Sequence, residues 1–398
     1  MDYLPLFLVW VAAVFLLPEI LRKFRIPWVT AVIFTGMLLG PYGLGVIYPE
    51  EATFFLSSLG LIFLMFTAGL DTKISFLRET GKETVIYTVL NFGVPFITGC
   101  LVGVVLGLDF FTSLILGTCF SSSSVGIIIP LTKELEVESK IKSTITAAIF
   151  LEDVSSLILL AILLQAITPI SPIPLPLFPI ALLLFLAIIF IIIPELQEMF
   201  LRLGKSDVFG AELRAVLLTL ALVSFMAELI GVHAMVGAFL AGLTLSDLLG
   251  KREELEKKIL SISYGFLIPI FLLNLGLTTD VKLLFSPEDA FLACLVIISL
   301  ITSKVLGGFL GARIAKFPLK TSLGMGVVTI AQMSTTLATA SLAVEYGIFS
   351  EELLASLVIL SIVTIILCPF LTKLIFRTRK NVSEDAKYEK SIGSTEES

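Results

Sequence analysis

Long apolar runs recur along almost the whole chain, with only short charged patches between them. Mean hydropathy is +1.04 and only 15% of the residues are charged, whereas a soluble domain carries roughly a quarter. In a bilayer every backbone polar group must be satisfied within the protein, so only helices and closed barrels span it. Runs such as 180–194 lack the alternation of barrel strands. The sequence predicts an all-α polytopic membrane protein and disfavours a soluble enzyme, a nucleic-acid-binding protein and a secreted disulfide scaffold.

Thirteen of these runs are long enough to predict transmembrane helices. They lie near 3–21, 27–45, 53–70, 84–107, 110–131, 143–168, 176–199, 209–230, 232–249, 260–277, 288–310, 321–345 and 351–376. The first run is not expected to be a cleaved signal peptide, because it has no basic start and a basic patch follows it.

The basic residues support this number of spans. All but two of the 27 lysines and arginines fall in alternate connections or in the C-terminal tail; the exceptions are Lys282 and Lys304. Cytoplasmic loops carry an excess of basic residues, so the N-terminus is expected outside and the C-terminus in the cytoplasm of a cell-membrane protein.

The chain is expected to form one transmembrane domain, residues 1–378, followed by a disordered cytoplasmic tail, 379–398. A proline-rich external linker, 168–174, separates the sixth and seventh spans. Two six-helix units would then follow an extra first helix, an arrangement typical of secondary transporters. No glycine-rich nucleotide-binding motif follows the last span, and no cofactor is expected.

Three charged residues lie deep within predicted spans, where each costs roughly 2.5–3.5 kcal/mol on insertion scales. They are Glu152, Asp153 and Lys304. Adjacent helix positions point about 100° apart, so one carboxylate can pair with Lys304 while the other faces a cavity. A carboxylate in such a site binds either a proton or a metal cation, and that competition is an exchange mechanism. A purely structural ion pair with a spare acid is the alternative.

Two further spans are polar at mid-membrane. One contains four consecutive serines, 121–124, and the other the segment 329–336, which reads TIAQMSTT. Hydroxyl clusters can simply join helices. Their places beside the charged spans also match paired broken helices, whose hydroxyls and freed backbone groups complete a midplane ion site. The candidate ion ligands are Ser123, Ser124 and Thr335.

Several segments resemble the monovalent cation/proton antiporter-2 family, most closely its bacterial NapA-type sodium/proton antiporters. Residues 58–71, SLGLIFLMFTAGLD, resemble the family signature LGLILLLFLAGLE, and residues 25–27 with Gly36, Gly40 and Pro41 resemble the preceding span. Residues 123–127, SSVGI, resemble the broken-helix motif, and residues 303–307, SKVLG, resemble a TKVLG segment that carries a buried lysine. Glu152-Asp153 falls where the NapA group has Asp-Asp. The resemblance covers almost all of 1–378.

The resemblance implies a thirteen-helix antiporter with inverted repeats and two broken crossing helices. Asp153 would carry Na⁺ and protons in turn, and Glu152 would pair with Lys304. The core would lie near 84–168 and 288–376, with the remaining spans as the scaffold of a homodimer. One departure is clear: the family often has an Arg-Gly-Glu or Gly-Glu signature after Gly326, where this chain reads Ile330-Ala331-Gln332-Met333-Ser334.

The function predicted is exchange of Na⁺ or Li⁺ for protons by alternating access. The exchange is expected to be electrogenic and to serve pH homeostasis, and the protein is not expected to be an enzyme. A K⁺/H⁺ antiporter or a potassium-efflux-type transporter or channel is the alternative. The efflux type often has Gln-Asp at the acid pair and usually carries a nucleotide-binding domain. An intramembrane aspartyl protease is disfavoured because its two carboxylates come from different helices. An organic-anion symporter would not need a Glu-Asp-Lys set.

Overall fold

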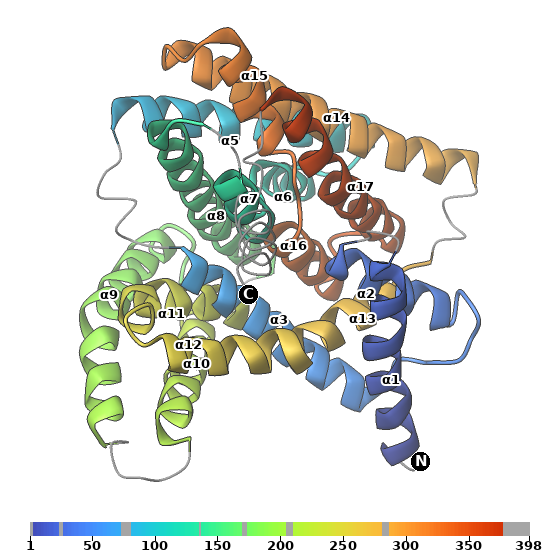
Figure 1. The fold of residues 1–398 in the computed structure, drawn as a ribbon, viewed down its shortest axis with the longest axis vertical. Coiled ribbons are helices and arrows are strands. Elements are labelled where there is room, and N and C mark those ends of the chain that lie inside the picture. The colour runs from blue at the N-terminus through green and yellow to red at the C-terminus, as the bar shows by residue number, and fades with distance from the viewer. Residues whose placement is uncertain are drawn as a thin grey trace, which may run out of the picture.

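The computed structural model describes residues 3–23, 27–72, 81–134, 137–168, 173–203, 210–280 and 286–376, and every regular element in these ranges is a helix (Figure 1). The predicted all-α fold is therefore confirmed. The predicted tail, 379–398, and residues 169–172 of the predicted linker lie outside the described residues.

The helices follow one another in this order: α1 Tyr3–Arg22, α2 Trp28–Leu39, α3 Glu51–Asp71, α5 Lys82–Val105, α6 Phe110–Ser121, α7 Val125–Glu134, α8 Ser139–Ile167, α9 Phe178–Leu203, α10 Ala211–Leu229, α11 Ala234–Leu249, α12 Glu253–Ile262, η1 Ser263–Leu267, α13 Ile268–Thr278, α14 Pro287–Ile314, α15 Leu319–Val328, α16 Ser334–Glu345 and α17 Glu351–Ile375. Each predicted span coincides with one of these helices or with consecutive ones. Within the described ranges, eight helices, some of them joined end to end, are long and apolar enough to cross a membrane. The chain is a multi-pass membrane protein, and the number of thirteen spans stays a prediction.

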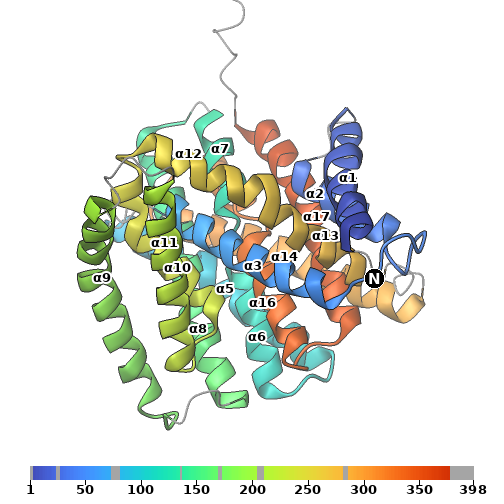
Figure 2. The same ribbon diagram turned by 90° about the horizontal axis from the view of Figure 1, so that it is seen from below.

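Two predicted boundaries differ from the structure for local reasons. The helix of the tenth span begins at Glu253, seven residues before the predicted start at 260. The first turns of α12 carry glutamates, which lower the hydropathy there and so shorten the predicted span. The π-turn η1 then joins α12 to α13 in one long rod (Figure 2). The second span ends early, at Leu39, since Pro41 disfavours helical backbone in the residue before it.

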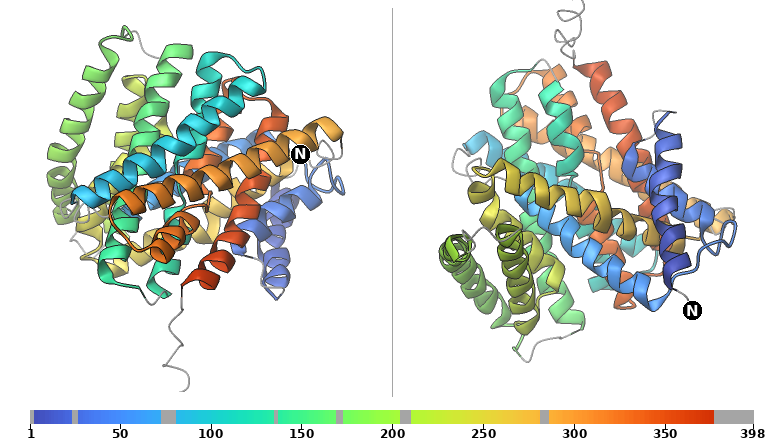
Figure 3. Two further views of the ribbon diagram at one scale, coloured as in Figure 1. Left: turned by 90° about the horizontal axis from the view of Figure 1, so that it is seen from above. Right: turned by 60° about the horizontal axis from the view of Figure 1, so that its bottom comes forward.

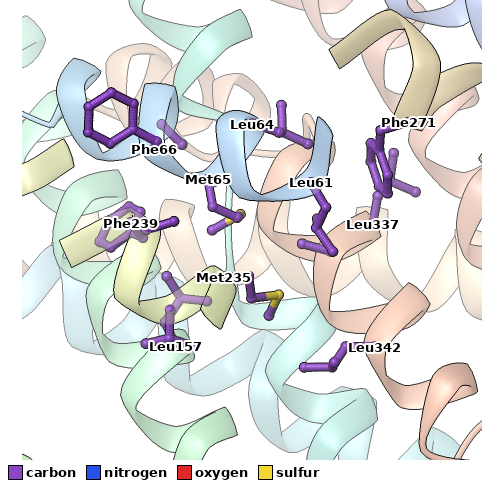
Figure 4. Packing of buried hydrophobic residues seen from close by; sticks show 14 of the residues in the cluster. Leu61, Leu64, Met65, Phe66, Leu157, Met235, Phe239, Phe271, Leu337 and Leu342 are labelled. Carbon is purple, nitrogen blue, oxygen red and sulfur yellow. The ribbon is translucent and has the colours of Figure 1, made fainter. Parts of the chain in front are cut away.

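The helices pack in two groups. α5, α6, α8, α14, α15, α16 and α17 lie in the upper part of Figure 1, and α5 and α14 run side by side across one face of the molecule (Figure 3). α1, α2, α3, α9, α10, α11 and α13 form the second group, in which α3 packs on α11 and α2 on α13. The groups meet through apolar side chains: Leu61 and Met65 of α3 and Met235 of α11 face Leu157 of α8 and Leu337 of α16 (Figure 4).

Two helices are interrupted at the centre of the first group. The chain is non-helical at 122–124 between α6 and α7, where Ser122 is extended, and again at 329–333 between α15 and α16. Serine and threonine hydroxyls compete for backbone partners, which disfavours continuous helix at both places. The N–H of Ser124 donates to the carbonyl of Ala331 at 2.8 Å, so the two interruptions cross in contact. The predicted pair of broken crossing helices is confirmed.

Small residues bring α14 against α15 beside this crossing. A Cβ on Gly308 would lie 2.6 Å from the Cα of Gly326, and a Cβ on Gly326 would lie 2.4 Å from the carbonyl oxygen of Val305. Any side chain at either position would force the two helices apart. The pair of glycines therefore fixes the depth at which Lys304, one turn away on α14, enters the core.

Candidate functional site

Glu152 and Asp153 lie on α8 where it passes the two interruptions, and both side chains are completely buried. Lys304 of α14 is also completely buried, with its Nζ 3.1 Å from Oε2 of Glu152. Replacing a charge's water shell in the interior is costly unless hydrogen bonds take its place. Glu152, Asp153 and Lys304 therefore each need hydrogen-bond partners within the protein.

The Lys304 ammonium has partners on three helices. Besides Glu152, it donates to the carbonyl of Ser121 at 2.6 Å, to Oγ of Ser123 at 2.9 Å and to the carbonyl of Asn91 at 3.4 Å. Ser121 is the last residue of α6, and the last carbonyls of a helix have no partner within it and carry a partial negative charge. Lys304 thus neutralises both a carboxylate and the broken end of α6.

Glu152 is held from a second side. Nδ2 of Asn91 donates to its Oε1 at 2.6 Å, and Oγ of Ser123 donates to its Oε2 at 2.8 Å. Oδ1 of Asn91 in turn accepts a hydrogen bond from Thr329 at 3.1 Å, so Asn91 ties the pair to the second interruption. Sequence reasoning does not find this contact, because Asn91 and Glu152 are 61 residues apart in the chain.

Asp153 has a different set of neighbours. Its Oδ1 accepts a hydrogen bond from Oγ1 of Thr335 at 3.0 Å. Its Oδ2 has no hydrogen-bond partner among the described residues, and neither does Oγ of Ser124, which is equally buried. Buried polar atoms are nearly always satisfied, so two such oxygens at one crossing indicate a place for a further group. An oxygen-only donor set suits a hard cation, and a single unpaired carboxylate oxygen suits a proton.

The predicted site residues therefore divide into two sets at the crossing. Glu152, Lys304 and Ser123 form the ion-pair network, whereas Asp153, Thr335 and Ser124 supply the second set of oxygens. The hydroxyl of Ser123 bonds to both members of the ion pair, Oε2 of Glu152 and Nζ of Lys304.

Gln332 is a residue whose role sequence reasoning did not find. Its Nε2 donates to the carbonyl of Ser122 at 2.8 Å, and its Oε1 accepts from Oγ1 of Thr336 at 2.5 Å. In the sequence, Gln332 lies in the segment that departs from the Arg-Gly-Glu signature. This departure draws attention to the position but does not indicate that Gln332 bonds to Ser122.

Comparison with known proteins gives consistent results. The family described as "Sodium/hydrogen exchanger, transmembrane" matches residues 9–378. The chain is 31% identical to a probable Na⁺/H⁺ antiporter 3 of Methanocaldococcus jannaschii over 96% of its length and 98% of the relative's. It is 28% identical to a Na⁺/H⁺ antiporter of Enterococcus hirae, over 89% and 93%. Among solved structures, the sodium proton antiporter MjNhaP1 of Methanocaldococcus jannaschii at pH 8 superposes with a TM-score of 0.72 at 18% identity, covering 94% of this chain and 98% of that one, which shows a shared fold.

Proposed function

Because the chain belongs to the family of transmembrane sodium/hydrogen exchangers, we propose that it exchanges Na⁺ for protons at the carboxylate of Asp153. Ion antiporters bind and release their substrates without covalent chemistry, so the family is one of transporters rather than enzymes. Li⁺ and K⁺ are the other cations to be tested.

The observation that carries this proposal is the contrast between two adjacent acids. Glu152 accepts hydrogen bonds from Asn91, Ser123 and Lys304, so both of its carboxylate oxygens already have partners. Oδ1 of Asp153 accepts a hydrogen bond from Thr335, whereas its Oδ2 has no partner among the described residues, and neither has Oγ of Ser124. Asp153 is therefore the acid that can alternate between a proton and a cation, with Thr335 and Ser124 as neutral ligands.

Exchange follows from competition at one carboxylate. A proton and Na⁺ each neutralise Asp153, and both cannot occupy it together, so release of one on either side of the membrane prepares binding of the other. The buried charge of an empty Asp153 is costly to move through the membrane core, which favours movement only when the site is occupied. Tight coupling is the result.

The helices that carry this site would move as a unit. α5 to α8 and α14 to α17, close to the predicted core, 84–168 and 288–376, form the moving part, and the remaining helices form a scaffold that pairs with a second copy. The contact that Leu61, Met65 and Leu157 make between the two groups is apolar, so sliding there exchanges one apolar contact for another (Figure 4). The N-terminus would lie outside and the C-terminus in the cytoplasm, as the basic residues favour.

Electrogenic exchange would need a second proton. If the Lys304–Glu152 pair opens when Asp153 takes a cation, the desolvated ammonium of Lys304 can release its proton. Two protons would then move for each Na⁺.

The test is proton flux in sealed vesicles that contain the purified protein, with Na⁺, Li⁺ or K⁺ added separately. Wild type should move protons in response to Na⁺, and Asp153→Asn should not, because an amide binds neither substrate. Asp247→Asn, the same change at an exposed position of α11, is the matched control and should stay active. Cation-dependent proton movement in a folded Asp153→Asn protein would overturn the assignment. Flux with K⁺ alone would identify a K⁺/H⁺ antiporter, and cation leak without proton movement a channel.

A further inference from the structure

The side chain of Gln332 links the two helix interruptions to each other. It is completely buried at the crossing, where its Nε2 donates to the carbonyl of Ser122 in the first interruption. Its Oε1 accepts from Thr336, one turn along α16, which fixes the rotation of the carboxamide. Its own N–H donates to Oγ1 of Thr364 on α17 at 3.2 Å. Every polar atom of the link has a partner, so its length is defined.

The two residues joined by this link are close in sequence to the proposed ligands. Ser122 precedes Ser124 by two residues, and Gln332 precedes Thr335 by three. The first interruption carries Oγ of Ser124, which has no partner in the described part of the chain, while Thr335 at the start of α16 donates to Oδ1 of Asp153. One backbone hydrogen bond, from Ser124 to Ala331, joins the two interruptions, and the hydroxyls of Ser122 and Thr336 lie 3.0 Å apart beside it. The Ser123 hydroxyl also lies 3.1 Å from the carbonyl of Thr329. The Gln332 carboxamide adds the bond from its Nε2 to the Ser122 carbonyl, so the distance and the angle between the segments depend on this bond together with the hydroxyl contacts.

We propose that Gln332 is a positioning residue that sets the cation selectivity of the Asp153 site by fixing the spacing of its ligands. The inference rests on the proposed exchange at Asp153. Ligand geometry has to be held within about 0.5 Å by surrounding hydrogen bonds for a site to discriminate. Na⁺ and K⁺ bear the same charge and differ in size, so a held spacing distinguishes them and a loose one does not.

The chemistry of the carboxamide defines the variants that test this role. The carbonyl of Ser122 follows the end of α6 and needs a donor, while Thr336 needs an acceptor. Methionine has nearly the shape of glutamine but makes neither bond. Ionised glutamate offers acceptors only and repels the Ser122 carbonyl. Protonated glutamic acid has one donor and one acceptor, so it restores both bonds, and Gln332→Glu turns the link on and off with pH.

The measurement is the ratio of the apparent KM for K⁺ to that for Na⁺ in vesicles; where K⁺ drives no flux, its inhibition constant against Na⁺ takes the place of its KM. Protons compete with both cations at the same carboxylate, so their effect cancels in the ratio, which reports ligand geometry. Gln197→Met is the matched control, because Gln197 of α9 is also completely buried and accepts a hydrogen bond from Thr219 at 2.5 Å, away from the site.

Gln332→Met should lower this ratio by about threefold or more, the range expected for losing one buried hydrogen bond. Gln197→Met should keep the wild-type ratio. Gln332→Glu should match the wild-type ratio in acid and depart from it as the pH rises.

A wild-type ratio in folded Gln332→Met would overturn the inference, and so would a Gln332→Glu protein whose ratio departs from wild type at the acid end. If Gln332→Met does not fold, Gln332→Glu decides alone, because one protein is compared at two pH values. Activity in Asp153→Asn would overturn the proposed exchange site. An unchanged ratio in an active Gln332→Met protein would overturn only the proposed role of Gln332.

Discussion

Glu152 and Asp153 are neighbours on α8, yet their carboxylates belong to separate hydrogen-bond networks, one centred on Lys304 and the other on Thr335. The helix period of 3.6 residues separates them, and the two broken helices supply a different set of partners on each side. Both oxygens of Glu152 thereby have hydrogen-bond partners, whereas Oδ2 of Asp153 has none within the described ranges. This division allows an ion pair and a substrate site to share one turn of helix.

The ion pair should be strongly coupled in stability. Lys304→Gln and Glu152→Gln are each expected to lower the free energy of unfolding by about 3–5 kcal/mol, since each leaves an unpaired buried charge. The double variant should lose much less than the sum of the two. Melting curves in detergent measure all four proteins. Strictly additive losses would show that the 3.1 Å contact between Lys304 and Glu152 has no energetic role.

The same variants test the proposed stoichiometry. A membrane-potential dye should report charge movement during Na⁺-driven exchange by wild type, and Lys304→Gln should reduce it while some exchange persists. Lys140→Gln is a suitable control, because Lys140 pairs with Glu83 where both side chains are largely exposed. Potential-independent exchange by wild type would rule out a second proton.

The hydroxyl residues should fall into two classes. Ser124→Ala and Thr335→Ala are expected to raise the KM for Na⁺ more than they lower the maximal rate, because neutral ligands act first on binding. Ser123→Ala should instead lower the melting temperature, as its hydroxyl serves Glu152 and Lys304. Initial rates over a range of Na⁺ concentration measure the first effect. Equal KM values in Ser124→Ala, Thr335→Ala and wild type would leave both hydroxyls without a role in binding.

Much of this arrangement could be predicted from the sequence because lipid restricts the choices. The apolar runs predict the helices. Charges within them, such as Glu152 and Lys304, indicate a functional site, because a charge in the membrane is costly. The serine run and the polar segment 329–336 predict the two interruptions for the same reason.

The partners of each polar atom could not be predicted. Asn91 donates to a residue 61 positions away, and Gln332 to one 210 positions away, so no local pattern relates them. The division of the hydroxyls, with Ser123 on Glu152 and Thr335 on Asp153, depends on how two helices cross, which a span prediction does not contain.

Asp109 offers a pH-dependent test at the start of α6. Its carboxylate caps the helix by accepting the N–H groups of Phe111 and Thr112 at 3.0 and 3.2 Å, and also the hydroxyl of Thr112. The Thr112 hydroxyl and these backbone N–H groups lower the pKa of Asp109 below its ordinary value. A lowered folded-state pKa means that the cap stabilises fully above the unfolded-state pKa and is lost as the pH falls through the folded value.

Asp109→Ala should therefore lower the free energy of unfolding by about 1 kcal/mol at neutral pH, and the difference from wild type should shrink below about pH 4. Asp109→Asn, which keeps a capping oxygen without the charge, should cost less at neutral pH and vary less with pH. Melting temperatures measured in detergent from pH 3 to 7 test both. A constant gap between Asp109→Ala and wild type across that range would contradict the ionised cap.

Asn91 and Asn274 make a matched pair for the last prediction. Both lie within helices and are buried, but Asn91 bonds to Glu152 and Thr329, whereas Oδ1 of Asn274 on α13 has no hydrogen-bond partner in the described part of the chain. Asn91→Leu should lower the free energy of unfolding by about 1.5–3 kcal/mol, because it removes a hydrogen bond to a buried charge. Asn274→Leu should be near neutral or stabilising, because it removes an unsatisfied polar atom at nearly constant volume.

Asn91→Leu should also weaken the energetic coupling between Lys304 and Glu152 in the double-variant comparison, since Glu152 loses the donor that orients it. Melting curves of the two variants in the same detergent decide the point, and equal losses at both positions would mean that the bond from Asn91 adds nothing to the network around Glu152.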